Sequence, residues 1–277
     1  MQKIEKWQID AGLCSGKGRV RKLQEDAWYF SYEKADPADM DFISKSFCAT
    51  TDSGGCAFAV FDGTGEGEYG REAACTAADW MKYLVRLSDR GMDLEKTLPA
   101  WSSIVNQKIR RDFPGAGTTM ALAFFSGPTV QLAYIGDCRV YRFRAGKLEQ
   151  QTRDHTQAEL MVQYGLMTPQ KAIVHPLRNT LYRYYGMENE MIGTAVEISE
   201  KYPLKESDRY ILCTDGVYEM LTGDALNRLV SEAGSAVSCA DLLYRQAIAE
   251  GGRDNLTVIV CEVRRQLLTD FSQSVFP

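Results

Sequence analysis

Short apolar runs with strand character recur along the chain. They are four to eight residues long and rich in Val, Ile, Phe and Tyr, a composition typical of buried strands. The connections SGP (126–128) and GDC (136–138) are so short that we expect antiparallel hairpins there, and a largely antiparallel sheet. The expected strands are 57–61, 118–125, 129–135, 139–144, 210–213 and 256–263.

Longer segments between these runs repeat their apolar residues at helical spacing. The clearest is 69–89, where Ala73, Ala77, Met81 and Leu84 fall on one stripe, and this helix should cover one face of a sheet. Strands bracketed by pairs of helices favour an α+β fold over a strict βαβ alternation. The other expected helices are 94–111, 222–232 and 239–250, with Thr222 and Ser238 as candidate N-caps of the last two.

The pattern changes between residues 152 and 187, where two short helical stretches and two prolines interrupt the strands. This segment is predicted to be an inserted flap. The chain has no repeat at a period of roughly 20 to 50 residues and no flexible linker. We therefore expect one domain over residues 1–265, with the flap inside it and a C-terminal tail over 266–277.

Composition excludes several classes of protein. Of the 277 residues, 45% are hydrophobic and 25% charged, as in ordinary globular proteins. The formal net charge of −5 and the pI of about 5.3 argue against binding to nucleic acid or to an anionic membrane. No apolar run reaches the roughly 18 to 20 residues that span a bilayer, and the first ten residues do not resemble a signal peptide.

Eight scattered cysteines without a C-x-x-C pair are expected to be free thiols in a reducing compartment, so the predicted location is cytoplasmic. The two histidines, His155 and His175, lie near no cysteine pair, which argues against structural zinc. Both are expected to have structural roles at the flap.

A glycine motif suggests a different function. Gly65, Gly67 and Gly70 form G-x-G-x-x-G between an expected strand and a helix, the position of a dinucleotide-binding fingerprint. However, Glu66 and Glu68 would face a pyrophosphate, and the expected hairpins contradict a parallel sheet. We therefore give little weight to a dinucleotide-binding oxidoreductase.

Several expected strands run directly into an aspartate. FAVFDG places Asp62 after one strand, and YILCTDG places Asp215 after another. Asp137 follows a third, and Asp254 precedes the last. One Asp-Gly is an ordinary turn, but four carboxylates at one sheet edge would repel each other unless a cation compensated them. Oxygen ligands of this kind suit Mg²⁺ or Mn²⁺.

The chain resembles the type 2C family of metal-dependent Ser/Thr protein phosphatases, in particular its bacterial branch. The resemblance rests on ordered blocks spanning most of the sequence. These are RVRKLQEDAWY, FAVFDGTGEGEYGREAA, GTTMALAFF, AYIGDCRVYRFRAGKLEQQTRDHT, HPLRN, YILCTDGVYEML and GGRDNLTVIV. The resemblance implies antiparallel β-sheets packed in a central sandwich, flanked by pairs of helices in α-β-β-α layers.

The same resemblance implies a set of metal ligands. Asp62 would bridge two Mn²⁺ or Mg²⁺ ions, with Asp215 and Asp254 completing the first site, and Glu25 with the Gly63 carbonyl holding the second. Asp26 and Asn255 would be supporting residues.

Asp137, in GDC where the family usually has GDS, would join Asp215 at a weaker third metal. Arg21 falls at the family's phosphate-binding arginine, where a guanidinium forks onto phosphate oxygens. The alternative for Arg21 is a solvated basic patch with Arg19 and Lys22. Many eukaryotic members have a histidine after FDG that protonates the leaving group, whereas this chain has Thr64.

The function implied is hydrolysis of phosphoserine and phosphothreonine in proteins by a water that two metals activate, reversing the action of a Ser/Thr kinase. The alternative is a catalytically weak relative that binds phosphoproteins as a regulator. Loss of a metal-binding carboxylate would mark such a relative. Because Glu25, Asp62, Asp215 and Asp254 are all present, the enzyme is favoured.

Overall fold

The computed structural model describes residues 4–35, 42–51, 55–65, 69–89, 93–188 and 196–268. Its strands are β1 (Ile4–Gly16), β2 (Ala27–Phe30), β3 (Glu33–Lys34), β4 (Ile43–Thr50), β5 (Cys56–Phe61), β6 (Gly63–Gly65), β7 (Ala116–Thr118), β8 (Met120–Ser126), β9 (Thr129–Ile135), β10 (Arg139–Arg144), β11 (Lys147–Gln150), β12 (Glu197–Ile198), β13 (Tyr202–Pro203), β14 (Arg209–Cys213) and β15 (Leu256–Leu268). Its helices are α1 (Gly70–Asp89), α2 (Leu94–Asp112), α3 (Gln157–Gln163), α4 (Pro169–Ala172), α6 (Asp215–Tyr218), α7 (Gly223–Glu232) and α8 (Ala236–Ala249).

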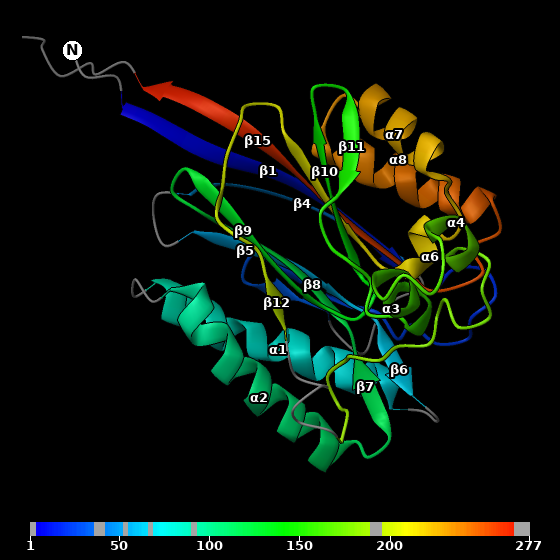
Figure 1. Cartoon of the computed structure of the whole chain (residues 1–277). Helices are drawn as coiled ribbons and strands as arrows, with labels where there is room; N and C mark the ends of the chain where they lie inside the picture. Colours follow the sequence, from blue (N-terminus) through cyan, green and yellow to red (C-terminus); the bar gives the residue numbers. More distant parts are fainter. Residues whose placement is uncertain are drawn as a thin grey trace, which may run out of the picture.

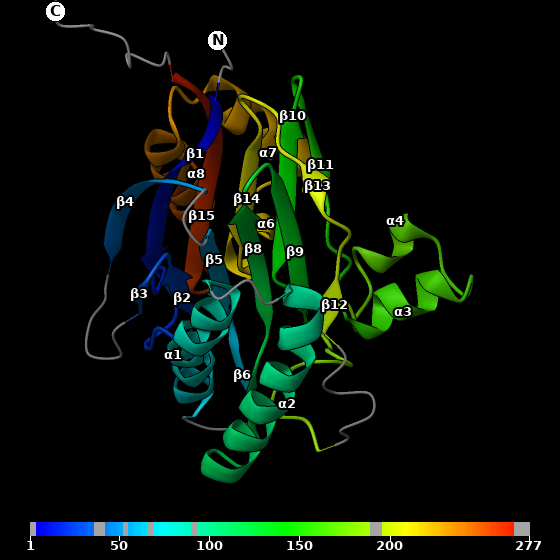
Figure 2. The same ribbon diagram turned by 90° about the vertical axis from the view of Figure 1, so that its left-hand side faces the viewer.

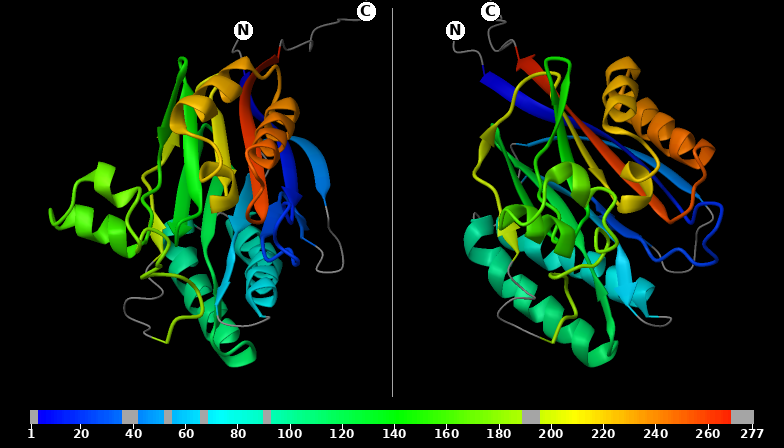
Figure 3. Two further views of the ribbon diagram at one scale, coloured as in Figure 1. Left: turned by 90° about the vertical axis from the view of Figure 1, so that its right-hand side faces the viewer. Right: turned by 45° about the vertical axis from the view of Figure 1, so that its right-hand side comes forward.

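Two large sheets pack face to face between two layers of helices, which confirms the predicted fold class (Figure 1). One sheet has the strand order β11-β10-β14-β15-β1-β4, and the other has β12-β9-β8-β5-β2-β3 with β13 also paired to β9. The strand pairs among the described residues are all antiparallel. Helices α1 and α2 cover the second sheet, and α7 and α8 cover the first (Figure 3).

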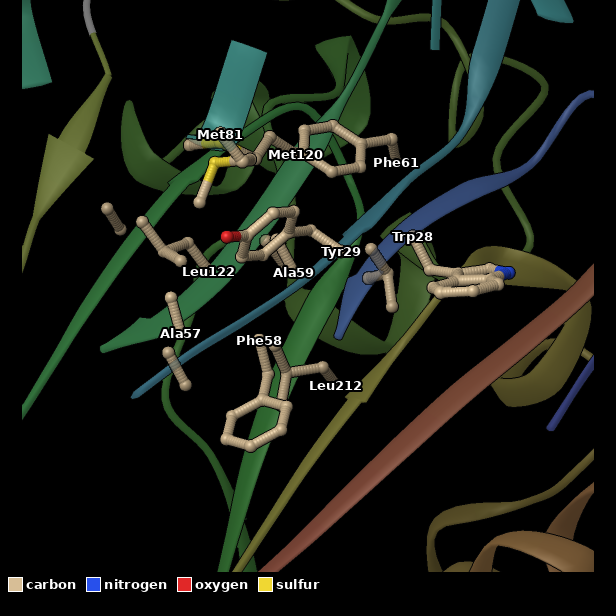
Figure 4. Packing of buried hydrophobic residues seen from close by; sticks show 14 of the residues in the cluster. Trp28, Tyr29, Ala57, Phe58, Ala59, Phe61, Met81, Met120, Leu122 and Leu212 are labelled. Carbon is tan, nitrogen blue, oxygen red and sulfur yellow. The ribbon is translucent and has the colours of Figure 1, made fainter. Parts of the chain in front are cut away.

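The core forms because strand β5 is buried on both of its faces. Phe58 points toward the opposite sheet and Leu212, whereas Ala57, Ala59 and Phe61 point toward the α1 side (Figure 4). Phe58 makes edge-to-face ring contacts with Phe30, Phe47 and Phe125, at centroid distances of 5.3, 5.8 and 5.9 Å. A strand buried on both faces has a continuous apolar run, which is why the sequence pattern predicted it.

One of the two expected hairpins is wrong. Strands β8 and β9 do form the hairpin at 126–128, with Ser126 paired to Thr129. Strands β9 and β10, however, belong to different sheets. Gly136 adopts a φ of 94°, which only glycine reaches without strain, and it turns the chain from one sheet into the other. Asp137 therefore lies at the crossing between the sheets.

The helices begin close to where the sequence predicts, with one correction. Thr222 caps α7, because its Oγ1 accepts a hydrogen bond from the Ala225 N–H at 3.3 Å. The expected cap Ser238 is instead the third residue of α8. It forms a capping box with the true N-cap, Ser235, in which each side chain bonds the other residue's backbone.

Residues 152–187 hold the two short helices expected of the flap, α3 and α4, which project from the side of the sandwich (Figure 2). The segment is tied to the body by a bridge between Thr118 and Tyr185. Among the described helices, none is both long and apolar enough to cross a membrane.

Candidate active site

The acidic residues that follow or precede strands meet at one end of the sandwich. Ala27 pairs with Phe61, so Asp26 and Asp62 lie at adjacent strand ends. In the other sheet, Cys213 pairs with Val258, which brings Asp215 near Asp254. The edge of the two sheets therefore gathers carboxylates from four separate segments, as the sequence predicts.

The carboxylates are close enough to oppose each other's ionisation. Burial, and then the nearby charges of Asp215, Asp26 and Asp137, raise the pKa of Asp62. Burial followed by repulsion from Asp254 raises the pKa of Asp215 to about 7. Burial and Asp215 raise the pKa of Asp137 as well. Full ionisation of the cluster is therefore unfavourable, and a bound cation would stabilise it.

Backbone contacts hold Asp62 and Asp215 in place. The Asp62 N–H donates to Thr119 Oγ1 at 3.1 Å, and its carbonyl accepts from Thr118 Oγ1 at 2.9 Å. Asp215 opens α6, and a Cβ at the next residue, Gly216, would lie 1.9 Å from the Asn255 carbonyl oxygen. Only glycine permits this close approach of the two ligand-bearing loops.

Two threonine hydroxyls hold the carboxylate of Asp26. Its Oδ2 accepts hydrogen bonds from Thr214 Oγ1 at 2.8 Å and from Thr257 Oγ1 at 2.7 Å. The residue is 4% exposed, and burial raises its pKa although both hydroxyls lower it. Asp26 therefore links the segments that carry Asp215 and Asp254, as a supporting residue would.

The Asn255 side chain holds the β1–β2 loop at three backbone positions. Its Nδ2 donates to the carbonyl oxygens of Lys17, at 3.1 Å, and Leu23, at 2.8 Å. Its Oδ1 accepts from the Glu25 N–H at 2.8 Å. One buried amide thus holds both ends of the β1–β2 loop and the backbone of Glu25.

Glu25 lies against glycines of the β5–α1 connection. A Cβ on Gly70 would come within 2.9 Å of Glu25 Oε1, and one on Gly63 within 2.8 Å of the Glu25 carbonyl. Burial, and repulsion from Asp254 and Glu72 despite the opposing effect of Arg21, raise the pKa of Glu25. Thr64 lies in β6 of this connection, and Gly67 of the glycine motif lies outside the described residues.

Sequence reasoning missed the residues that position Asp137. Tyr218 Oη donates to the Asp137 carbonyl at 3.1 Å, and the Arg139 guanidinium lies 3.6 Å from the centre of the Tyr218 ring. The N–H of Gly136 donates to Nδ1 of the buried His155 at 3.0 Å. No local pattern marks these contacts, because each joins segments far apart in the sequence.

Arg21 contacts a carboxylate in this structure. Its Nη2 lies 2.6 Å from Asp254 Oδ2, and its side chain is 50% exposed. The sequence did not predict this ion pair. It neutralises one acid of the cluster, and it holds a guanidinium at the mouth of the site.

The donor set fits a hard divalent cation in kind, because it consists of carboxylate and carbonyl oxygens without His or Cys. Within the described part of the chain, however, no group of three or more Asp, Glu, His or Cys side chains is arranged to hold a metal ion as it stands. In this structure the Arg21 guanidinium occupies Asp254 Oδ2.

A cavity of about 760 Å³ lies beside the cluster, between the flap and the α6–α7 segment. Its lining includes Arg139 and Tyr218, which position Asp137, together with Ile173 of the flap. Arg178 and Arg253 also line it, so the cavity offers both apolar and cationic contacts next to the carboxylates.

Comparisons with known proteins show the family to which the chain is similar. A family model described as protein phosphatase 2C matches residues 41–256. The Mycobacterium tuberculosis H37Rv protein named serine/threonine protein phosphatase PstP is 34% identical over 155 residues. That match covers 55% of this chain and 28% of the relative, so the chain spans about a quarter of the relative's length.

Solved structures share the fold over nearly the whole chain. The M. tuberculosis phosphatase PstP/Ppp has a TM-score of 0.72 at 25% identity, covering 93% of this chain and 99% of that one. The catalytic domain of PstP in complex with two manganese ions has a TM-score of 0.69 at 22% identity, with the same coverage.

Proposed function

Because the chain belongs to the protein phosphatase 2C family, we propose that it is a metal-dependent phosphatase of phosphoserine and phosphothreonine in proteins. The observation that carries this proposal is the meeting of Asp62, Asp137, Asp215 and Asp254 at one sheet edge, with Arg21 beside them. Such a cluster is costly without cations and is the donor set of a two-metal hydrolytic site.

Each acidic residue has a proposed role. Asp62, which lies within electrostatic range of Asp137, Asp215 and Asp254, would hold both Mn²⁺ or Mg²⁺ ions. Asp215 and Asp254 complete one site, and Glu25 with the Gly63 carbonyl completes the other.

Asp137, with Asp215, holds a weaker third ion, and Asp26 and Asn255 hold the ligand-bearing segments together. When bound, the cations supply a water of lowered pKa that can attack phosphorus.

The protein's own contribution is to orient the phosphate and stabilise its charge. Arg21 is the proposed phosphate ligand, since its guanidinium is within reach of Asp254 and half exposed. Its contact with Asp254 uses Nη2, so the other N–H groups of the guanidinium could donate to phosphate oxygens. Thr64 provides no ionisable group for protonating the leaving oxygen, so that proton comes from solvent or a bound water.

Replacing Arg21 by Ala should lower kcat/KM for phosphopeptides by about 10- to 100-fold, because it removes charge-assisted hydrogen bonds to the phosphate. Arg21→Lys should recover only part of the loss, since an ammonium cannot fork onto two oxygens. The measurement is steady-state kinetics with saturating Mn²⁺. Kinetics equal to wild type would assign Arg21 to the solvated basic patch.

The test of the proposed reaction is phosphate release from synthetic peptides in the presence of Mn²⁺. We expect phosphoserine and phosphothreonine peptides to yield inorganic phosphate and the free hydroxyl peptide, detected by mass spectrometry. Binding of the phosphopeptide without release of phosphate would instead support the regulatory alternative. Reduction or oxidation of a nicotinamide would support the dinucleotide alternative.

The cellular setting follows from the same proposal. Phosphorylated Ser/Thr proteins are the substrates, an opposing Ser/Thr kinase supplies them, and neither nucleic acid nor a membrane is a partner. All eight cysteines are free thiols, and burial raises the pKa of Cys56 and Cys213 to about 12. Unpaired thiols support a reducing, cytoplasmic location.

A further inference from the structure

The β1–β2 loop carries a concentration of positive charge, most of which has no role in the proposed reaction. Residues 17–23 contain Lys17, Arg19, Arg21 and Lys22 and no acid, in a chain whose net charge is −5. The side chains of Arg19 and Lys22 are exposed, and neither forms an ion pair within the described residues. Only Arg21 of this set has a role in the proposed chemistry.

The loop is held firmly beside the carboxylate cluster. Asn255 bonds the carbonyls of Lys17 and Leu23, and the Arg19 N–H donates to the Gly252 carbonyl at 2.7 Å. Gly18, with a φ of 76°, packs so closely that a Cβ there would lie 2.1 Å from the Asp254 carbonyl oxygen. The loop backbone that carries these basic side chains is therefore preorganised, so little backbone conformational entropy is lost when the side chains bind a ligand.

A second segment extends the charge toward the cavity. Arg253 is exposed, directly precedes Asp254 and lines the cavity beside the flap. Arg19 bonds the neighbouring Gly252, and the stems of the Arg19 and Arg253 side chains lie near Gly252 and Gly251 respectively. The loop and Arg253 together therefore form a basic rim beside Asp254. We define this rim as Arg19, Lys22 and Arg253. In Figure 1 the blue loop lies at the end of the sandwich where β15 begins.

We propose that this rim binds negative charge flanking the scissile phosphate, so that the site prefers phosphopeptides with neighbouring carboxylates or a second phosphate. The inference rests on the proposed function. Three residues of extended peptide span about 10 Å, within reach of long side chains on either side of Arg21. Complementary charge at such a distance attracts the substrate and depends on salt.

The test compares three phosphothreonine peptides that differ only in their flanks, which are neutral, glutamate-rich, or neutral with one additional phosphoserine. At low salt, we expect kcat/KM to be about 10-fold higher for an anionic peptide than for the neutral one, as two or three exposed charge pairs allow. A preference for the glutamate-rich peptide would identify carboxylates as the source of the flanking negative charge. A preference for the peptide with the second phosphate alone would identify phosphate as that source. Added salt should reduce the preference.

The loop variant is Arg19→Glu/Lys22→Glu. Its control is Lys96→Glu on the distant helix α2, because Lys96 is likewise exposed. The loop variant should lose the preference, and the control should keep it. The milder Arg19→Gln/Lys22→Gln protein should lose part of it, which guards against misfolding of the charge-reversed loop. Equal kcat/KM for the three peptides in wild type, or an unchanged preference in both loop variants, would overturn the inference.

Two further measurements separate this inference from the proposed function. Turnover of p-nitrophenyl phosphate, which has no flanking residues, reports on the reaction alone. Fluorescence anisotropy of the labelled peptides, with the same loop variants, reports on binding even if no phosphate is released. Tighter binding of anionic peptides that is lost in the loop variants supports the rim whatever the turnover. Equal affinities would refute it.

Discussion

Metal-stripped protein should release no phosphate from phosphopeptides or p-nitrophenyl phosphate, and Mn²⁺ or Mg²⁺ should restore turnover. The reason is that water near neutral pH is a poor nucleophile until a divalent cation lowers its pKa from 15.7 toward about 7. Cys138 lies beside the carboxylate cluster, but it is buried, and burial raises the pKa of its thiol, so it supplies no thiolate nucleophile that could replace the water. The measurement is phosphate release in excess EDTA, followed by titration with Mn²⁺ or Mg²⁺.

A second readout follows metal binding without turnover. Cations that bind only the folded protein should raise its melting temperature, by an amount that grows with the ratio of metal concentration to Kd. They also relieve the repulsion that raises the pKa values of Asp62 and Asp215. If neither Mn²⁺ nor Mg²⁺ changed the melting temperature, or if full activity remained in EDTA, the cluster would not be a metal site.

The Asp62→Asn protein should lose turnover by about 10³-fold, the upper end of the effect of one electrostatic group in other active sites. The amide keeps the volume of the carboxyl group but lacks the charge needed to bridge two cations. Because Asp62 lies in a repulsive cluster, the substitution should not lower the melting temperature of the metal-free protein. Steady-state kinetics at saturating Mn²⁺ and thermal melting measure the two effects.

Asp241→Asn is a suitable control, since the ion pair of Asp241 among the described residues is with Arg245, one turn away on the outer helix α8. It should leave kcat unchanged. If the Asp62→Asn protein kept near wild-type turnover at saturating Mn²⁺, the bridging role of Asp62 would be wrong. Loss of its folded structure would instead indicate that the carboxylate is needed for the fold.

The sequence predicted best those elements whose local pattern matches their burial. Strand β5 is apolar throughout and buried on both faces, and α1 has a continuous apolar stripe. Strands β1 and β4 were missed. In β4 the exposed and half-buried residues alternate at the edge of a sheet, and its polar Ser and Lys residues obscure the pattern. β1 is held by pairing with β15, some 250 residues away in the sequence, and no local pattern marks that long-range pairing.

The features of the candidate site likewise divide into those that local sequence predicts and those that it does not. Each acid adjoins a strand end, so Asp62, Asp215 and Asp254 could be identified from their neighbours in sequence. The ion pair between Arg21 and Asp254 and the hydrogen bond from Tyr218 to Asp137 could not. These contacts depend on where the chain crosses between sheets, and the crossing at Gly136 was itself mistaken for a hairpin. Local sequence predicted the acidic cluster, and long-range topology determined the partners of its members.

The pairing of β1 with β15 has a practical consequence for handling the protein. Gly16 pairs with Leu256 beside the carboxylates, whereas Ile4 pairs with Leu268 at the opposite end of the same ribbon. Thirteen paired residues place those ends about 40 Å apart. A surface linker attached at the Ile4 end of the ribbon would be far from the carboxylate cluster. Beads or sensor chips carrying the protein in this orientation would leave the basic rim open to the solution.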